Sequence, residues 1–105
     1  MGEREKTPHF VVIPEFRVEP DVMAAFLEAA MDDAKRSLAD EPGCQQFDVV
    51  CPEDKDNVVL FYEVYDDRDA FEVHLQTPHL KRFQAAMQSL GVEESQVRFA
   101  AREPL

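Results

Sequence analysis

Residues 57–79, NVVLFYEVYDDRDAFEVHLQTPH, decide the fold of this chain. The first nine are rich in β-branched and aromatic side chains, a composition that is typical of a strand. Asp67 can then cap a short helix that continues to about Gln76. Thr77 followed by Pro78 is the pattern of a helix cap and first turn, so another helix begins there. The stretch predicts a strand, a short helix and a longer helix in direct succession.

The rest of the chain supplies elements that can pair with this stretch. In chain order, the predicted elements are a strand over residues 9–18, a helix from about residue 21 to residues 41–43, strands over residues 44–51 and 57–65, the short helix to about residue 76, a helix over residues 77–91 and a strand over residues 96–102. This order is the split βαβ, or ferredoxin-like, arrangement, an α+β fold with helices on one face of an antiparallel sheet. Residues 1–8 read as a loose tail, and residues 9–105 form one domain.

The first helix is amphipathic. Asp21 is its candidate cap, although Glu19 or Pro20 could shift the start. Asp32 and Arg36 are spaced to form an ion pair on the polar face. The apolar face is predicted to contain Met23, Phe26, Leu27, Ala30, Ala34 and Leu38. In the preceding strand, Pro14 lacks a backbone donor and indicates an edge or a bulge.

The strand over residues 57–65 is apolar on both faces. One face has Val58, Leu60, Tyr62 and Val64, and the other has Val59, Phe61 and Tyr65, interrupted only by Glu63. Helices on one side leave the other face uncovered, and a single chain rarely exposes an apolar patch of that size. The pattern therefore predicts a homodimer that forms through the sheet faces, with an open apolar face as the alternative.

Charge and composition exclude several partners. The chain has 22 acidic and 11 basic residues, a formal net charge of −11 that repels nucleic acid and anionic membranes. No apolar stretch has the length of a membrane span, and the charged N-terminus does not resemble a secretory signal. Cys44 and Cys51 lie too far apart along one strand for a disulfide, so we expect free thiols and a cytoplasmic location.

Two histidines are candidates for chemistry. His74 lies on the apolar side of the short helix, where it is either a core histidine satisfied by one hydrogen bond or a general acid/base. His79 lies in the first turn of the next helix, where a surface or capping role is the alternative to a site role. The two are five residues apart across the Thr77-Pro78 break, which is not the spacing of helical metal ligands, so no metal site is predicted.

Two acids in apolar strands are further candidates. Glu63 and Asp48 each need a partner or a raised pKa if they are buried, and the alternative for each is an outward position. Tyr62 and Tyr65 could add phenolic hydroxyls to a pocket, or they could be core residues. The sequence contains neither a glycine-rich phosphate loop nor a Gly-x-Ser-x-Gly nucleophile motif.

As a set, these pieces resemble the antibiotic biosynthesis monooxygenase domain family. The resemblance covers about residues 10–100. The pieces that carry it are Glu41-Pro42-Gly43-Cys44, Phe47-Asp48-Val49, Tyr62-Glu63-Val64-Tyr65, Ala70 with His74, and Thr77-Pro78-His79-Leu80 with Phe83. Residues 61–79 are also similar to the enzyme that isomerises phosphorylated autoinducer-2, from the same superfamily.

The resemblance implies a dimeric α+β barrel with a pocket between sheet and helices and no bound cofactor. Classical members oxidise polycyclic phenols or quinols with molecular oxygen. By position, His74 matches the family's helix histidine and acts as acid/base, Glu63 matches its strand acid, and His79 matches its Thr-Pro-His element. Asp48, Tyr62 and Tyr65 would then be polar pocket residues. Many relatives have tryptophan at position 65, and the lack of any tryptophan argues against haem degradation.

Three functions follow as expectations. The first is a cofactor-independent monooxygenase that acts on a small quinol-like or phenolic metabolite. The second is an isomerase or degrading enzyme for a small hydroxy-carbonyl signal, which needs an acid/base but no oxygen. The third is a non-catalytic small-molecule-binding module. Convergence of Glu63 and His74 on one cavity favours the enzymes, whereas a solvent-facing Glu63 and a fully packed His74 favour the module.

Overall fold

The computed structural model describes residues 8–105. Its elements are β1 (His9–Arg17), the 3-10 turn η1 (Pro20–Val22), α1 (Met23–Asp40), β2 (Cys44–Val50), β3 (Val58–Tyr65), α2 (Arg68–His74), α3 (Pro78–Leu90) and β4 (Glu93–Arg102). This order confirms the predicted ferredoxin-like α+β fold. The predicted loose tail lies outside the described residues except for Pro8, which is exposed and in no regular element.

The four strands form one antiparallel sheet in the order β2-β3-β1-β4. β1 is therefore an inner strand, although Pro14 cannot donate to a neighbour. The pairing of β1 with β3 skips Ile13 and Pro14, and the pairing with β4 shifts register between Glu15 and Phe16. The irregularity predicted at Pro14 is thus an interrupted ladder followed by a bulge, rather than a sheet edge.

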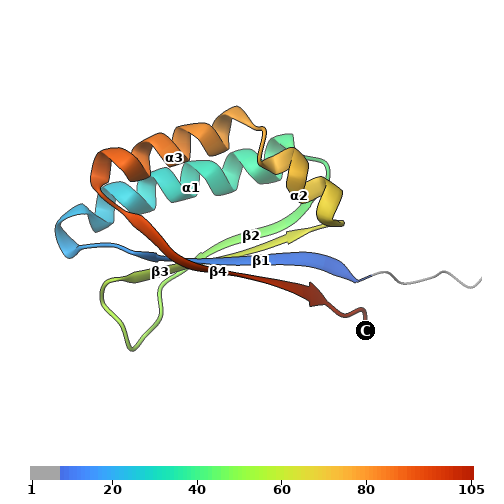
Figure 1. The fold of residues 1–105 in the computed structure, drawn as a ribbon, viewed down its shortest axis with the longest axis horizontal. Coiled ribbons are helices and arrows are strands. Elements are labelled where there is room, and N and C mark those ends of the chain that lie inside the picture. The colour runs from blue at the N-terminus through green and yellow to red at the C-terminus, as the bar shows by residue number, and fades with distance from the viewer. Residues whose placement is uncertain (1–7) are drawn as a thin grey trace, which may run out of the picture.

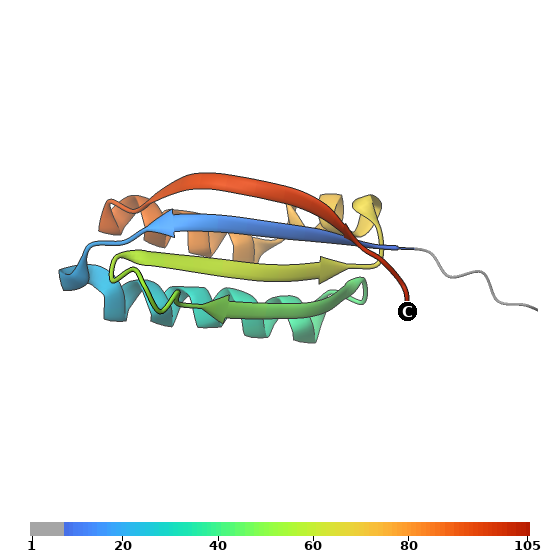
Figure 2. The ribbon, with the colours of Figure 1, turned by 90° about the horizontal axis from the view of Figure 1, so that it is seen from below.

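All helices lie on one face of the sheet, with α1 and α3 side by side (Figure 1). The opposite face has no helix over it, as the view from below makes clear (Figure 2). An aromatic cluster fills the space between the layers, with ring centroids 4.7 to 6.4 Å apart among Phe16, Phe26, Phe61 and Phe83. Such pairs add to the burial that holds helices on the sheet.

The start and the apolar face of α1 differ from the prediction. Residues 20–22 form a 3-10 turn that Glu19 precedes without a side-chain bond, so Asp21 does not cap the helix. Leu38 is exposed, and Asp33 and Ser37 are buried in the positions that the sheet covers. The buried stripe follows Phe26, Ala30, Ala34 and Ser37, because a helix this long rotates its contact face slightly along its length.

The predicted pair of Asp32 and Arg36 is also wrong. Asp32 instead accepts from Arg82 of α3, with Arg82 Nε 2.9 Å from Asp32 Oδ2. Arg36 pairs one turn further on with Asp40, at 3.6 Å. The neighbouring helix supplies a partner that a single-helix pattern cannot reveal.

The caps of α2 and α3 are as predicted. Asp67 Oδ1 accepts from the Ala70 amide at 2.9 Å, and Thr77 Oγ1 accepts from the Leu80 amide at 3.2 Å. Gly91 ends α3 with a left-handed φ of 70°. β4 begins at Glu93, three residues before the predicted start. The prediction missed these residues because they are exposed and show no apolar alternation.

Both cysteines are free thiols, as predicted, with Cys44 buried and Cys51 exposed. Across residues 8–105, no helix combines the length and the apolar character that crossing a bilayer requires.

Gly43 lets α2 approach the start of β2. A Cβ atom at this position would lie 2.6 Å from the Cβ of Ala70, and the Asp66 amide donates to the Gly43 carbonyl at 2.8 Å. We expect Gly43→Ala to lower the free energy of unfolding by about 1–3 kcal/mol, since neither backbone segment can move freely. Urea denaturation measures this change.

Ala70→Gly provides the partner for a double-mutant cycle. It destabilises α2 by itself but removes the methyl group that a new Cβ at position 43 would meet. The double variant should therefore be more stable than the sum of the single changes. Strict additivity would mean that the close approach does not limit position 43.

Candidate functional site

A cavity of about 260 Å³ lies between the sheet and the helices. Its apolar lining includes Phe16, Phe61, Phe71, Phe83 and Phe99, and its polar lining consists of Asp33, Glu63, His74, Gln84 and Glu94. No Lys or Arg of residues 8–105 lines it. The cavity therefore suits a small, flat, uncharged molecule better than an anion.

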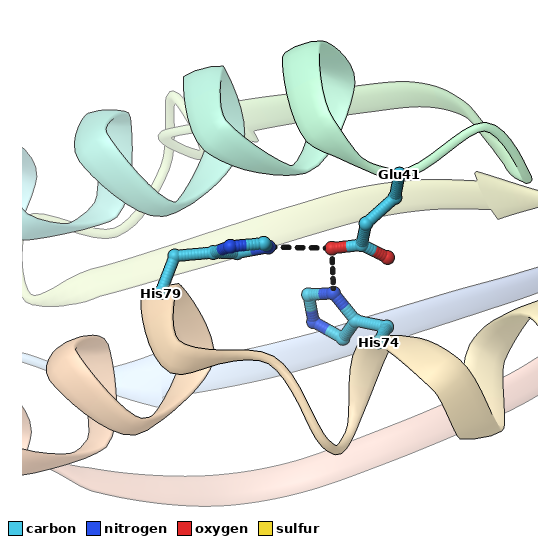
Figure 3. A group of neighbouring side chains, drawn as sticks. All are labelled: Glu41, His74 and His79. Carbon is cyan, nitrogen blue, oxygen red and sulfur yellow. Dashed lines mark hydrogen bonds and ion pairs between the residues drawn. The ribbon is translucent and has the colours of Figure 1, made fainter.

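His74 is the last residue of α2, and its side chain is buried at one wall of this cavity. Its Nδ1 lies 2.8 Å from Oε2 of Glu41, the residue that directly follows α1 (Figure 3). An ionised carboxylate only accepts, so Nδ1 carries the hydrogen of this bond. Nε2 of a neutral His74 is then left with a lone pair.

Nε2 of His74 makes no hydrogen bond within residues 8–105. Among the side-chain N and O atoms of residues 8–105, only Glu41 Oε1 is both fully enclosed and without a hydrogen-bond partner. The unpartnered Nε2 of His74 is therefore not fully enclosed. A ring nitrogen that is unpartnered, reachable and on the wall of a cavity can exchange a proton with a bound molecule.

His79 meets the same carboxylate from the other side. Its Nε2 lies 2.5 Å from Oε2 of Glu41, and its side chain is also buried (Figure 3). Although the two histidines lack the spacing of ligands on one helix, the Thr77-Pro78 break does not keep them from the same carboxylate. Thr77 Oγ1 donates to the His74 carbonyl at 2.8 Å, and this tight corner turns α3 back towards Glu41. His79 is therefore neither on the surface nor a cap, and it does not line the cavity.

The shared carboxylate shifts the pKa of its neighbours. Burial raises the pKa of Glu41, but the hydrogen bonds from His74 and His79 outweigh it and hold that pKa below its ordinary value. Burial lowers the pKa of His74, yet the hydrogen bond to Glu41 and the neighbouring carboxyl groups bring that pKa above its ordinary value. The pair is thus an ionised acceptor beside a basic imidazole.

Glu63 points towards the helices and lines the same cavity as His74. Burial raises its pKa to about 8, while the Tyr65 hydroxyl, which donates to Oε1 at 2.6 Å, and the charge of His74 lower it. The Tyr65 ring packs against the His74 ring with centroids 5.4 Å apart. Tyr65 is therefore a core residue that positions Glu63, and Glu63 is largely protonated near neutral pH.

Asp48 and Tyr62 lie on the other side of the sheet. They pair in register across β2 and β3, one residue away from the pair of Phe47 and Glu63. Asp48 is exposed and accepts from Gln46 Nε2 at 2.6 Å, and Tyr62 is half-buried. The structure does not bring these two residues to His74, because strand alternation points them away from it.

Two buried acids of this region lie outside the set of candidates drawn from the sequence. Asp33 is 1% exposed, lines the cavity, and has its pKa raised to about 6 by burial. Asp33 follows Phe26 by seven residues and Ala30 by three, so it lies on the buried stripe of α1. This helical spacing could have identified Asp33 from the sequence. Glu41 follows the end of a helix, where no periodicity marks burial.

The arrangement can do two kinds of chemistry. His74 and Glu63 are a base and an acid on the wall of one cavity, which suits proton transfer to and from a bound molecule. Separately, the ligand atoms of Glu41, His74 and His79 all lie within 4.8 Å of one another, so this group could also hold a metal ion.

Comparisons with known proteins agree with this fold. Residues 9–86 match the family model described as antibiotic biosynthesis monooxygenase. An uncharacterised protein of Synechocystis, sll1783, is 34% identical over 73 residues, which are 70% of this chain and 49% of that protein. The chain thus spans about half the length of this curated relative.

Solved structures give the same result at lower identity. A candidate antibiotic biosynthesis monooxygenase from Caulobacter crescentus has a TM-score of 0.82 at 23% identity, with 92% of each chain covered. A Bacteroides thetaiotaomicron protein of unknown function, suggested to be an oxidoreductase, has a TM-score of 0.82 at 20% identity, with 91% of this chain and 99% of that one covered. These likenesses show the fold, and the family match extends over most of the chain. The chain therefore belongs to the antibiotic biosynthesis monooxygenase family.

Proposed function

We propose that this chain is a cofactor-independent monooxygenase that acts on a small quinol-like or phenolic metabolite. One observation carries the proposal: His74 lines an aromatic cavity and its Nε2 has no hydrogen-bond partner within residues 8–105, while its Nδ1 is held by buried Glu41. This is the arrangement of an oriented general base. The monooxygenase-named family and its solved members support oxygenase chemistry in general.

His74 begins the reaction by taking a hydroxyl proton from the bound quinol. The resulting anion is electron-rich and reduces molecular oxygen directly, so the substrate supplies all the electrons. The balanced reaction converts a quinol and one O₂ into a hydroxyquinone and one water. One atom of the O₂ enters each product. The hydrogen bond that His74 Nδ1 donates to the Glu41 carboxylate stabilises the imidazolium that forms on His74.

Glu63 supplies the complementary acid. Its protonated carboxyl, held through Oε1 by Tyr65, can donate to a substrate or peroxide oxygen on which negative charge develops. His79 has a positioning role in this scheme, because it holds Glu41 without lining the cavity.

The lining favours an uncharged aromatic substrate. Five phenylalanines surround the cavity, and its ionisable groups are acids and one histidine. A phosphorylated or carboxylated substrate would meet Asp33, Glu63 and Glu94 without a compensating Lys or Arg among the described lining residues. The volume of about 260 Å³ suits a molecule of one or two fused rings.

A second candidate function is isomerisation or degradation of a small hydroxy-carbonyl compound. The observation that favours it is the acid-base pair itself, since Glu63 and His74 could move a proton between two carbons without oxygen. The convergence of these two residues on one cavity speaks for an enzyme over a non-catalytic binding module. Activity under strict anaerobiosis would identify the isomerase.

We further propose that two chains form a homodimer through their sheet faces, with Asp48 and Tyr62 at or near the interface. The outward residues Ile13 and Leu60 are only half-buried in one chain, and they line a hollow on the uncovered face together with Glu15, Gln96 and Arg98. A second sheet would cover this apolar surface.

The base is tested by oxygen consumption with a panel of simple quinols. We expect His74→Ala to lower the rate by about 100-fold or more, since general-base contributions are of this size. His9→Ala, a histidine in β1 that does not line the cavity, should leave the rate unchanged. Equal rates for wild type and His74→Ala would remove His74 from the mechanism, and no turnover of any quinol would count against the oxygenase.

The protonated state of Glu63 is tested by the pH dependence of stability. Its pKa in the folded chain is raised to about 8, so between its ordinary value and pH 8 the folded state holds a proton that the unfolded state has released. Stability due to this group is therefore lost as the pH rises through that window. Between pH 5.5 and 8, wild type should lose about 2 kcal/mol more than Glu63→Gln in urea denaturation.

Glu28→Gln is the matched control for this measurement, because it makes the same carboxyl-to-amide change at an exposed position of α1. Its stability should follow the wild-type curve over the same pH range. Parallel curves for wild type and Glu63→Gln would contradict a protonated Glu63.

The dimer is tested by light scattering at low micromolar concentration. We expect a mass of twice the 12.0 kDa of one chain. Leu60→Asp should give the mass of one chain, because it places a charge in the proposed interface, whereas Leu60→Met should not. A wild-type mass of one chain would refute the sheet-face dimer, provided that circular dichroism shows a folded protein.

A further inference from the structure

We propose that Glu41, His74 and His79 form a binding site for a divalent transition-metal ion of the zinc class. The ligand atoms are Nδ1 of His74, Nε2 of His79 and a carboxylate oxygen of Glu41, and all lie within 4.8 Å of one another (Figure 3). Two imidazoles and one carboxylate are a donor set that such ions prefer. The three residues come from α2, α3 and the segment after α1, so the folded chain assembles the site.

A second observation points to a missing partner. Oε1 of Glu41 is buried and has no hydrogen-bond partner within residues 8–105. Oε2 already receives two ring nitrogens, so the two oxygens of one carboxylate are used unequally. A buried acceptor without a donor is costly, and a cation beside the carboxylate would interact with both oxygens.

The local charge also suits a cation. The buried polar side chains of residues 8–105 include three carboxyl groups, Asp33, Glu41 and Glu63, and no Lys or Arg. Asp33 is close enough to both histidines and to Glu41 to interact with their charges. A divalent ion between the two imidazoles would therefore meet carboxyl groups and no competing buried Lys or Arg of residues 8–105.

The present spacing fits the metal-free state. Oε2 of Glu41 lies 2.8 Å from Nδ1 of His74 and 2.5 Å from Nε2 of His79, with one hydrogen in each gap. A tetrahedral ion with bonds of about 2.0–2.1 Å places its ligand atoms about 3.3 Å apart. The ion would therefore replace the two N–H hydrogens after the side chains open by about 0.5–0.8 Å, and a fourth position would be left for water.

A second hollow adjoins Glu41, which does not line the main cavity. Glu41 lines a surface hollow of about 330 Å³ together with Pro42, Gly43, Asp67 and Asp69. Two of these residues are exposed acids, so the field at the entrance attracts cations. An ion can thus approach without passing through the aromatic cavity.

Metal binding would change what His74 can do. With the ion on Nδ1, a neutral imidazole carries its hydrogen on Nε2, so His74 presents a donor to the cavity and is no longer a base. The ion would therefore inhibit the proposed oxygenase. This consequence rests on the proposed function, whereas the binding site itself does not.

Binding is tested on the full chain after treatment with a chelator. Titration with cobalt chloride should give visible d–d absorption bands of a four-coordinate site that saturate at one ion per chain, and zinc chloride should displace the cobalt. His79→Ala should weaken binding at least tenfold while leaving the cavity lining unchanged. His9→Ala should bind like wild type.

Three outcomes overturn the metal site. They are no absorption bands with wild type, retention of wild-type affinity by both His79→Ala and Glu41→Gln, and equal loss of affinity in His9→Ala. Circular dichroism of each variant separates lost ligands from lost fold. If the chain binds one metal ion but shows no oxygenase activity without metal, the metal site is supported and the oxygenase is rejected. If the chain is an active oxygenase but binds no metal, the oxygenase is supported and the metal site is rejected.

Discussion

One carboxylate oxygen joins the three helical segments at the site. Oε2 of Glu41 accepts from His74 at the end of α2 and from His79 at the start of α3, while the Glu41 amide closes the last turn of α1 by donating to Ser37. All three side chains are buried, so loss of one leaves polar groups without partners, at a cost of about 1–3 kcal/mol each. The orientation of the His74 ring towards the cavity depends on this shared acceptor, and Gly43 permits the close approach of α2 that the geometry requires.

The number of donors decides the charge of each buried acid. Glu41 receives two ring N–H groups, and they hold its pKa low despite burial. Glu63 receives only the Tyr65 hydroxyl, which does not offset desolvation, and its pKa rises to about 8. Two glutamates in one small core therefore have opposite protonation near neutral pH. Glu63 thus gives the cavity a protonated acid, while ionised Glu41 holds the His74 ring that lines the cavity.

Residue periodicity reveals the elements but not their convergence. The β-branched and aromatic run of β3, the Asp67 and Thr77 caps and the Gly91 stop are local signals, and each specifies its element. The burial of Asp33 is also periodic, since it follows Phe26 by seven residues. Glu41 and His79, by contrast, meet His74 only because the corner at Thr77 reverses the chain, and no spacing in the sequence encodes that distance. Interactions between helices, such as Arg82 with Asp32, are hidden for the same reason.

The register of β3 ties the site to the uncovered sheet face. Glu63 faces the helices and Tyr62 faces away, so a slip of one residue would exchange them and move Glu63, with its donor Tyr65, to the uncovered face. Apolar residues on both faces would tolerate such a slip if only burial mattered. The packing of Tyr65 on His74 favours one register, because a slip would carry Tyr65 and Glu63 together to the uncovered face, away from His74. The contact between Tyr65 and His74 thus also determines which side of β3 stays uncovered by the helices.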